Sequence, residues 1–488
     1  MENNGQGLFE ENSQNHGIRP YGGGRLPLFF DYTNDGHSDV AIARNDPQGL
    51  EFFRWNPGSN SYVETTNSVG VDRECLRNNY GLISDLFNNN KLHYLCMPES
   101  RVAERAYDLS TIPFTEVTGI VDNVGVYTDA VLADFNGDLR QDMFALRGRV
   151  RPSSASLVSS TRVEGWFAVS AGQSKGMTFK SNGSISIRLY ARDVGEPSGL
   201  RIGSSGTRPT SFPAVLNPNN SSHQGTFSNP TGVSVYAGYN TSRQEWSVFL
   251  QSANDSGENV YVQVDGQGLR DVNTTGFQGS DGAVTPALLL NNGSRLVNAG
   301  SRGIGSVSCG GVAAADFDND MDIDVYMTCR TGTSNIANRL YLNNGSGQFT
   351  RVNNFGGEGP IGVGIDGRQG TGEMVTTGDY DVDGFMDLYV TNGNRLFPHP
   401  HKDRFTAGGP TNIIRNLGNN NRWLEIDLLG VQSNRDGFGA KVLVTAGGRT
   451  QVREQNGMYH RYSHDSRRIH VGLGNNTQAN VRLSLIHI

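Results

Sequence analysis

Short apolar segments alternate along this chain with acidic loops of nine residues. In the first example, Leu28, Phe29 and Phe30 precede a loop over residues 31–39, and apolar residues follow it. An apolar run on each side of a tight polar loop predicts two antiparallel strands joined by a turn. The same unit recurs at residues 134–142, 316–324 and 379–387, and a degenerate copy lies at residues 85–93.

The spacing of these loops predicts a repeated architecture. Most neighbouring loops begin roughly 50–60 residues apart, and a four-stranded propeller blade needs about 40–50 residues plus its connections. The loops at 134 and 316 are separated by a much longer stretch. That stretch holds either an inserted domain or two blades that have lost their loops. We favour an insertion, because residues 288–297 resemble the segment 338–350 that follows a later loop.

The inserted stretch also has the pattern of a β-domain. Apolar and polar residues alternate in residues 184–190 and 233–236, and turns rich in Pro and Asn separate such runs. We therefore expect an all-β chain: a β-propeller with an inserted β-domain and a small C-terminal β-domain. The expected parts are a first propeller segment (1–154), the insert (155–283), a second propeller segment (284–400) and the C-terminal domain (401–488).

Oxygen-bearing side chains occupy positions 1, 3, 5 and 9 of each intact loop. With a backbone carbonyl at position 7, this spacing suits Ca²⁺, which accepts six to eight oxygens in flexible geometry, better than Mg²⁺. Asp and Asn are also good turn residues, but four matches in phase favour calcium with a structural role, because closely packed carboxylates repel one another without a cation. We expect the copy at 85–93, which has lost most charges, to bind no ion. The candidate ligands are Asp31, Thr33, Asp35, Asp39, Asp134, Asn136, Asp138, Asp142, Asp316, Asp318, Asp320, Asp324, Asp379, Asp381, Asp383 and Asp387.

The loop pattern resembles the FG-GAP/VCBS repeats of integrin-α-like propellers over roughly residues 20–155 and 284–395. The motifs Asn421-Arg-Trp-Leu-Glu-Ile, Ser433-Asn-Arg-Asp-Gly-Phe-Gly and His470-Val-Gly-Leu-Gly resemble an ASPIC/UnbV domain. The combination is similar to the cartilage acidic protein family and its microbial relatives. This resemblance implies a propeller, usually of seven blades, of which five units are visible here. It also implies an extracellular location, and it brings no shared catalytic chemistry.

Two features of the termini carry expectations of their own. The polar N-terminus lacks the pattern of a signal peptide, so we expect either that the signal was removed from this sequence or that its true start is missing. Residues 483–488 resemble a translated sequencing adapter, so we expect the C-terminal domain to be truncated.

The four cysteines allow two local disulfides. Cys309 and Cys329 flank the loop at 316–324 almost symmetrically, which places them opposite each other on antiparallel strands. Cys75 and Cys96 bracket another hairpin with looser symmetry. Two disulfides would suit an oxidising compartment, whereas the alternative is four buried free thiols.

N-glycosylation sequons are concentrated in the proposed insert, which would carry sugars if the source glycosylates its proteins. Chance occurrence in a chain rich in Asn, Ser and Thr is an equal alternative. The sequons lie at Asn182, Asn219, Asn220, Asn240, Asn254, Asn273, Asn292, Asn344 and Asn475.

The remaining features exclude several functions. The net charge of −7 argues against nucleic-acid binding, and no apolar run is long enough for a membrane helix. No motif of hydrolases, zinc proteases or nucleotide-binding enzymes occurs. We interpret the C-terminal histidines as surface residues; they are His399, His401, His460, His464 and His470.

We therefore expect a secreted, calcium-stabilised propeller scaffold for adhesion or for matrix or glycan binding, and not an enzyme. Its partners would be extracellular glycans or proteins, with self-association into oligomers or fibres as a further mode. Two alternatives stay open. One is a self-assembling structural subunit of an extracellular fibre, and the other is a polysaccharide lyase or hydrolase built on a propeller.

Overall fold

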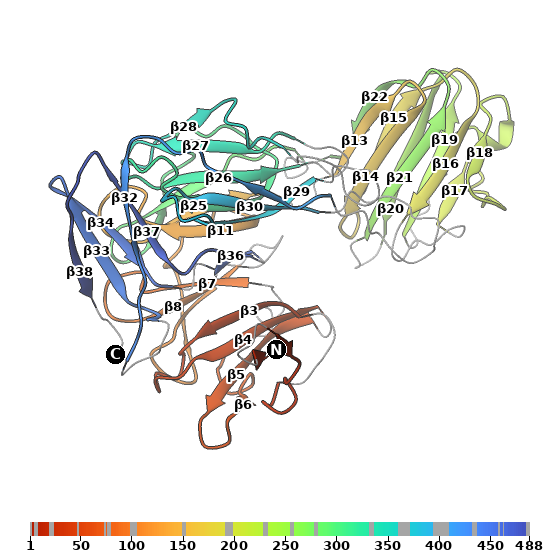
Figure 1. Cartoon of the computed structure of the whole chain (residues 1–488). Coiled ribbons are helices and arrows are strands. Elements are labelled where there is room, and N and C mark those ends of the chain that lie inside the picture. The colour runs from red at the N-terminus through yellow and green to blue at the C-terminus, as the bar shows by residue number, and fades with distance from the viewer. Residues whose placement is uncertain are drawn as a thin grey trace.

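A computed structural model of the chain consists almost entirely of β-strands (Figure 1). The described residues include the short 3₁₀ turn η1 (Ser221–His223) and no long helix. In the described part of the chain no helix is long and apolar enough to span a membrane. The structure describes all residues except 1, 4–7, 19–23, 46–47, 73–74, 76–79, 98–104, 149–152, 191–198, 228–232, 254–257, 278–281, 331–335, 360–370, 394–408, 432–436, 457–458, 462 and 485–488.

Five antiparallel sheets follow one another as the units of a propeller, and we number them blades 1 to 5. In each, a nine-residue loop joins the first two strands. Blade 1 contains β3 (Gly24–Phe30), β4 (Asp39–Asn45), β5 (Gln48–Asn56) and β6 (Ser61–Glu64). Blade 2 contains β7 (Tyr80–Ser84), β8 (His93–Met97), β9 (Arg105–Asp108) and β10 (Thr115–Val117). Blade 3 contains β11 (Tyr127–Ala133), β12 (Asp142–Arg147), β23 (Ala287–Asn291) and β24 (Leu296–Asn298).

The last two blades complete the series. Blade 4 contains β25 (Cys309–Ala315), β26 (Asp324–Cys329), β27 (Arg339–Asn343) and β28 (Phe349–Val352). Blade 5 has three described strands, β29 (Thr371–Gly378), β30 (Asp387–Gly393) and β31 (Asn412–Ile414). The all-β, propeller-type fold expected from the repeats is confirmed, whereas a total of seven blades stays a prediction. A separate two-stranded pair, β1 (Glu2–Asn3) and β2 (Phe9–Glu10), lies near the N-terminus.

The blades pack face to face in chain order. One apolar cluster joins blades 1, 2 and 3, a second joins blades 3 and 4, and a third joins blades 4 and 5. A central blade is thus covered on both faces, which explains why its inner strands are continuous apolar runs and do not alternate. Every residue of β25 is buried, for example.

The insert is a two-sheet sandwich placed between β12 and β23, so it interrupts blade 3. Its own apolar core, which includes the fully buried Trp246, is separate from the blade clusters, and Figure 1 shows the insert to one side of the blades. One sheet has the order β13 (Ser154–Ser159), β14 (Arg162–Val169), β21 (Glu258–Gly266), β16 (Ile185–Tyr190), β18 (Ala214–Leu216). The other has the order β17 (Leu200–Ile202), β19 (Val233–Asn240), β20 (Glu245–Ser252), β15 (Ser174–Lys180), β22 (Arg270–Thr275).

The C-terminal strands form a small domain, which we call the cap, at one end of the blades (Figure 1). Its apolar core includes Met321 from the loop of blade 4, and its Phe438 belongs to the cluster of blades 1 to 3. The cap and the propeller therefore share apolar packing. The cap contains β32 (Arg422–Ile426), β33 (Lys441–Ala446), β34 (Arg449–Glu454), β35 (Tyr459–His460), β36 (Ser463–His464), β37 (Ile469–Gly474) and β38 (Asn480–Ser484).

Candidate metal loops beneath the cap

The nine-residue loops share one backbone conformation. In blade 4, the carboxylate of Asp316 accepts the amide N–H of Asp320 on Oδ1 and that of Met321 on Oδ2, both at 3.0 Å. Positions 4 and 6 of this loop, Asn319 and Met321, have φ values of 58° and 84°. The same pair of bonds to the first carboxylate occurs in the other four loops, at Asp31, Asp85, Asp134 and Asp379.

Left-handed backbone at position 6 favours glycine, and blades 1 and 5 have Gly36 and Gly384 there. Blade 4 instead has Met321, for which this conformation costs roughly 1–2 kcal/mol. Its side chain packs into the core of the cap. We infer that this packing offsets the backbone cost, since burying an apolar side chain of this size stabilises by about 1.5–3 kcal/mol.

The carboxylates of blade 4 converge as a cation site requires. One oxygen from each of Asp316, Asp318 and Asp320 lies within 4.8 Å of the other two. Burial, followed by the neighbouring carboxylates, raises the pKa of Asp320 to about 6, and burial raises the pKa of Asp316 to about 7. The Oδ1 atom of Asp318 is buried and has no hydrogen-bond partner among the described residues. An unpartnered oxygen in a cluster of like charges fits a hard cation such as Ca²⁺.

Blade 5 holds a second cluster of this kind, formed by Asp379, Asp381 and Asp387, again within 4.8 Å of one another. Arg415 lies beside it, with Nε 2.6 Å from Asp381 and Nη2 3.0 Å from Asp383. The arginine therefore supplies positive charge at the rim of the cluster, where half of its side chain is exposed.

The loops of blades 1 and 3 have fewer carboxylates, because position 3 is Thr33 or Asn136. The hydroxyl of Thr33 donates to Asp39 at 3.0 Å, which brings positions 3 and 9 together. Burial raises the pKa of Asp39 to about 6 and that of Asp142 to about 7. These loops keep the ligand positions in sequence, but their three carboxylates do not converge within 4.8 Å of one another as those of blades 4 and 5 do.

The carboxylate at position 9 also ties each of the four intact loops to its own blade. Asp324 accepts the N–H of Phe317 on Oδ2 at 3.0 Å and that of Asn343, in the third strand, on Oδ1 at 2.8 Å. Asp142 accepts the amide N–H of Asn291 in the same way, although the whole insert separates these two residues in the sequence. The loop geometry is thereby fixed by residues far away along the chain.

The cap lies directly on these loops. The ring nitrogen Nε2 of His470 donates to the carbonyl oxygen of Gly384 in blade 5 at 3.0 Å. The amide N–H of Gly474 donates to the carbonyl oxygen of Asn319 in blade 4 at 2.8 Å. Arg449 forms an ion pair with Asp322 in blade 4. The candidate metal loops of blades 4 and 5 are therefore also part of the docking surface of the cap.

A hairpin of the cap, β35 and β36, enters between the first strands of the blades. His460 Nδ1 donates to Asp129 of blade 3 at 3.2 Å, and the amide of Arg461 donates to the same carboxylate at 2.9 Å. On the other side, Asp465 accepts the amide of Thr377 of blade 5 at 2.7 Å. A space of about 80 Å³ remains between the cap and the blades, lined in part by His460 and Asp465.

The prediction that the C-terminal histidines are surface residues is wrong for His460 and His470, which are 1% and 8% exposed. Their burial results from the docking of the cap, which local sequence composition does not reveal. His464 is partly buried, and His399 and His401 lie outside the described residues. Burial lowers the pKa of His470 to about 4, so its ring is neutral at pH 7.

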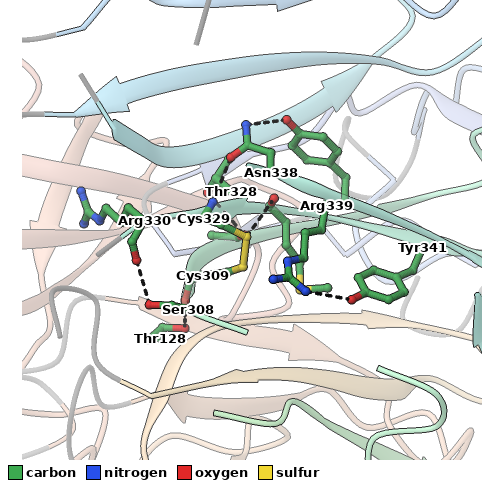
Figure 2. The surroundings of a disulfide bond; sticks show 12 residues. Thr128, Ser308, Cys309, Thr328, Cys329, Arg330, Asn338, Arg339 and Tyr341 are labelled. Carbon is green, nitrogen blue, oxygen red and sulfur yellow. Dashed lines mark hydrogen bonds between the residues drawn. A yellow bond between two sulfur atoms is a disulfide. The ribbon is translucent and has the colours of Figure 1, made fainter. Parts of the chain in front are cut away.

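Both expected disulfides are present. Cys309 and Cys329 face each other on β25 and β26 (Figure 2), with Cα atoms 3.7 Å apart. Around them, Thr128 of blade 3 donates its hydroxyl to the carbonyl of Cys309, and Asn338 accepts the amide of Cys329. The second bridge joins Cys75 to Cys96.

Seven of the sequon asparagines are exposed and Asn240 is partly exposed, whereas Asn254 lies outside the described residues. Their accessibility is compatible with modification, which stays a prediction. The exposed ones are Asn182, Asn219, Asn220, Asn273, Asn292, Asn344 and Asn475.

Comparisons with known proteins match two parts of the chain. The family model "FG-GAP-like repeat" matches residues 316–390, and "ASPIC and UnbV" matches residues 430–484. Cartilage acidic protein 1 of Mus musculus is 31% identical over 120 residues, which cover 24% of this chain and 16% of that protein. The Homo sapiens protein is 30% identical over 120 residues, covering 24% and 15%. The matched region thus spans less than a fifth of the curated relatives.

Two solved structures share a general likeness. The V. cholerae biofilm matrix protein Bap1 matches with 10% identity and a TM-score of 0.17, covering 81% of this chain and 88% of its own. The exo-β-1,3-galactanase from Phanerochaete chrysosporium matches with 10% identity and a TM-score of 0.17, covering 49% and 68%. The family matches, and not these distant structures, confirm the resemblance: the chain contains an FG-GAP-like repeat region followed by an ASPIC and UnbV segment.

Proposed function

We propose that this protein is a secreted, non-catalytic propeller scaffold that is stabilised by calcium and binds extracellular glycans or proteins. The observation that carries the proposal is the convergence of carboxylates in the loops beneath the cap, best seen at Asp316, Asp318 and Asp320. A divalent cation there would relieve the repulsion between these groups, so metal binding would couple to folding. The two disulfides agree with an oxidising compartment.

The experiment compares thermal unfolding in excess calcium and in EGTA, with bound metal counted by mass spectrometry. We expect a large upward shift with calcium and up to one ion for each of the four intact loops. Asp318→Asn should lower the count by one ion and reduce the shift, because it weakens the ligand whose oxygen has no other partner. Asp271→Asn, an exposed residue of the insert, serves as the control. Equal unfolding in calcium and EGTA, with no bound metal, would reject the calcium part of the proposal.

A groove of about 630 Å³ between blade 5 and the cap supports the proposed binding of extracellular glycans. Two exposed aromatic side chains, Tyr380 and Tyr389, line it beside Asp427 and Arg468. Aromatic rings next to planar charged groups suit a saccharide, which presents apolar ring faces and hydroxyl groups.

Binding to a panel of neutral and acidic polysaccharides tests this groove. Tyr389→Ala should reduce binding while leaving the thermal midpoint nearly unchanged, because the side chain is 47% exposed. Val63→Ala, an exposed position on blade 1, is the control. Turnover of any of these polysaccharides would instead favour an enzyme on this propeller.

Self-assembly is a second candidate, favoured by the edges of one insert sheet. The edge strand β13 exposes Leu157 and Val158, and the opposite edge strand β18 exposes Val215. Exposed apolar sheet edges pair readily with other chains. Filaments seen by electron microscopy, and lost in Val158→Lys, would support this mode.

A further inference from the structure

The loop of blade 2, over residues 85–93, keeps the conformation of the metal loops although its sequence has diverged. Asp85 accepts the amide of Asn89 on Oδ1 at 3.1 Å and that of Asn90 on Oδ2 at 3.3 Å. Positions 4 and 6, Asn88 and Asn90, have φ values of 52° and 66°, as in the other loops. A backbone shaped for a cation has therefore been retained.

Two of the four ligand positions in this loop can no longer hold calcium. Position 3 is Phe87 and position 9 is His93, where the intact loops have oxygen-bearing side chains. The two rings contact each other edge to face, with centroids 5.1 Å apart. Calcium needs six to eight oxygen ligands, and this loop cannot supply them.

A lysine from the cap is inserted into this loop. The ammonium Nζ of Lys441 lies 2.9 Å from the carbonyl oxygen of Asp85 and 3.2 Å from its Oδ2, and it also donates to Oδ1 of Asn88. The side chain of Lys441 is only 6% exposed, and that of Asp85 is fully buried. Three oxygen atoms of the loop, from positions 1 and 4, thus surround one positive charge.

Glu454, directly opposite Lys441 in the pair of strands β33 and β34, completes the cluster. Its Oε2 lies 3.8 Å from the ammonium and accepts the hydroxyl of Ser84 at 2.8 Å, while Oε1 accepts the amide of Asp85 at 2.9 Å. The loop has one carboxylate of its own, whereas each intact metal loop has three or four at its ligand positions. This smaller negative charge matches a monovalent cation better than a divalent one.

We propose that the loop of blade 2 is a metal-independent attachment site, in which the buried ammonium of Lys441 supplies the positive charge that fastens the cap to the propeller. The cap then has one attachment that does not depend on calcium, beside its contacts with the loops of blades 4 and 5. The loop therefore has a role that its sequence alone does not indicate, because it binds a positive charge from within the chain. This inference does not rest on calcium binding elsewhere and can fail or succeed independently of it.

Amine labelling of the wild-type protein tests the site directly. An amine-reactive reagent should modify Lys441 at least tenfold more slowly than Lys91, and equally slowly in calcium and in EGTA. Lys91 lies in the same loop, but its side chain is 49% exposed and pairs only at the surface with Asp108. Rapid labelling of Lys441 in EGTA alone would show that its burial depends on metal, and rapid labelling in both conditions would show that it is not inserted. Either result overturns the proposal.

Substitutions test the role of the charge. Lys441→Met should lower the thermal midpoint by about 5–10 °C in both calcium and EGTA, because it leaves two buried carboxylates without a cation. Lys91→Met should change it little. The double variant Lys441→Met with Glu454→Gln should recover part of the loss, since it removes one of the two unpaired charges and keeps an oxygen for the amide of Asp85. No loss in Lys441→Met, or no recovery in the double variant, would contradict the proposal.

Discussion

His460 offers the sharpest test of how the cap is held in the centre of the blades. Its imidazole lies between two buried carboxylates, with Nδ1 3.2 Å from Asp129 and Nε2 3.5 Å from Asp465. Burial alone would lower the pKa of the ring, but the charges of Asp129 and Asp465 outweigh burial and raise it to about 10. The ring is therefore cationic at neutral pH and links blade 3 to the cap.

The sign of the pH dependence follows from this raised pKa. A histidine in the unfolded chain titrates near 6.5, so between pH 6.5 and 10 the folded protein binds one proton more than the unfolded chain. The stabilisation is full below pH 6.5 and is lost as the pH rises towards 10. A tenfold change in proton affinity corresponds to about 1.4 kcal/mol, so the raised pKa gives roughly 5 kcal/mol as an upper limit. We expect about 3–5 kcal/mol, because the contact with Asp465 is longer than a good hydrogen bond.

The assay is urea unfolding of the wild type and of His460→Gln from pH 6 to 10.5 at saturating calcium. The variant should be less stable by about 3–5 kcal/mol at neutral pH, and the difference should shrink as the pH approaches 10. His223→Gln, a histidine at the surface of the insert, should match the wild type throughout. A difference between wild type and His460→Gln that stays constant over this range would refute a charged imidazole.

Three further predictions concern separate parts of the molecule. Met321→Ala should lower the free energy of unfolding by roughly 2–4 kcal/mol, since it empties a place in the cap core; an unchanged urea midpoint would contradict this packing. Replacing both Cys309 and Cys329 by Ser should cost about 3 kcal/mol, as expected for a bridge across 20 residues, and equal stability of this variant and the oxidised wild type would speak against it. Trp246→Ala should cost about 3–5 kcal/mol but lower only the calorimetric transition of the insert, because that residue is fully buried in a separate core; a shift of every transition would disprove the separation.

Local patterns in the sequence were sufficient for the blades. A nine-residue loop between two apolar runs defines a hairpin wherever it occurs, and the near-symmetric positions of Cys309 and Cys329 follow from pairing across that hairpin. The long interval between two loops indicated the insert, because a blade cannot absorb so many residues.

The site beneath the cap could not be predicted in the same way. Lys441 and Asp85 are 356 residues apart, and nothing in the residues around Lys441 distinguishes it from an ordinary surface lysine. Likewise His460 lies in a polar segment, which is typical of a surface loop. One signal was present in the sequence: Met321 stands at the loop position where two other loops have glycine. A large apolar residue that takes a left-handed backbone conformation indicates that another element of the protein covers its side chain.

The arrangement of cores and loops indicates which parts of the molecule unfold together. The cap shares Met321 with blade 4 and Phe438 with the first three blades, and it places Lys441 and His460 on buried carboxylates of blades 2 and 3. Removing a cation from the loops of blades 4 and 5 would therefore strain the surface on which the cap rests, as well as the loops themselves. The insert has no part in these contacts among the described residues and keeps its own core. It follows that blades and cap should respond to calcium as one cooperative unit, while the sandwich unfolds on its own.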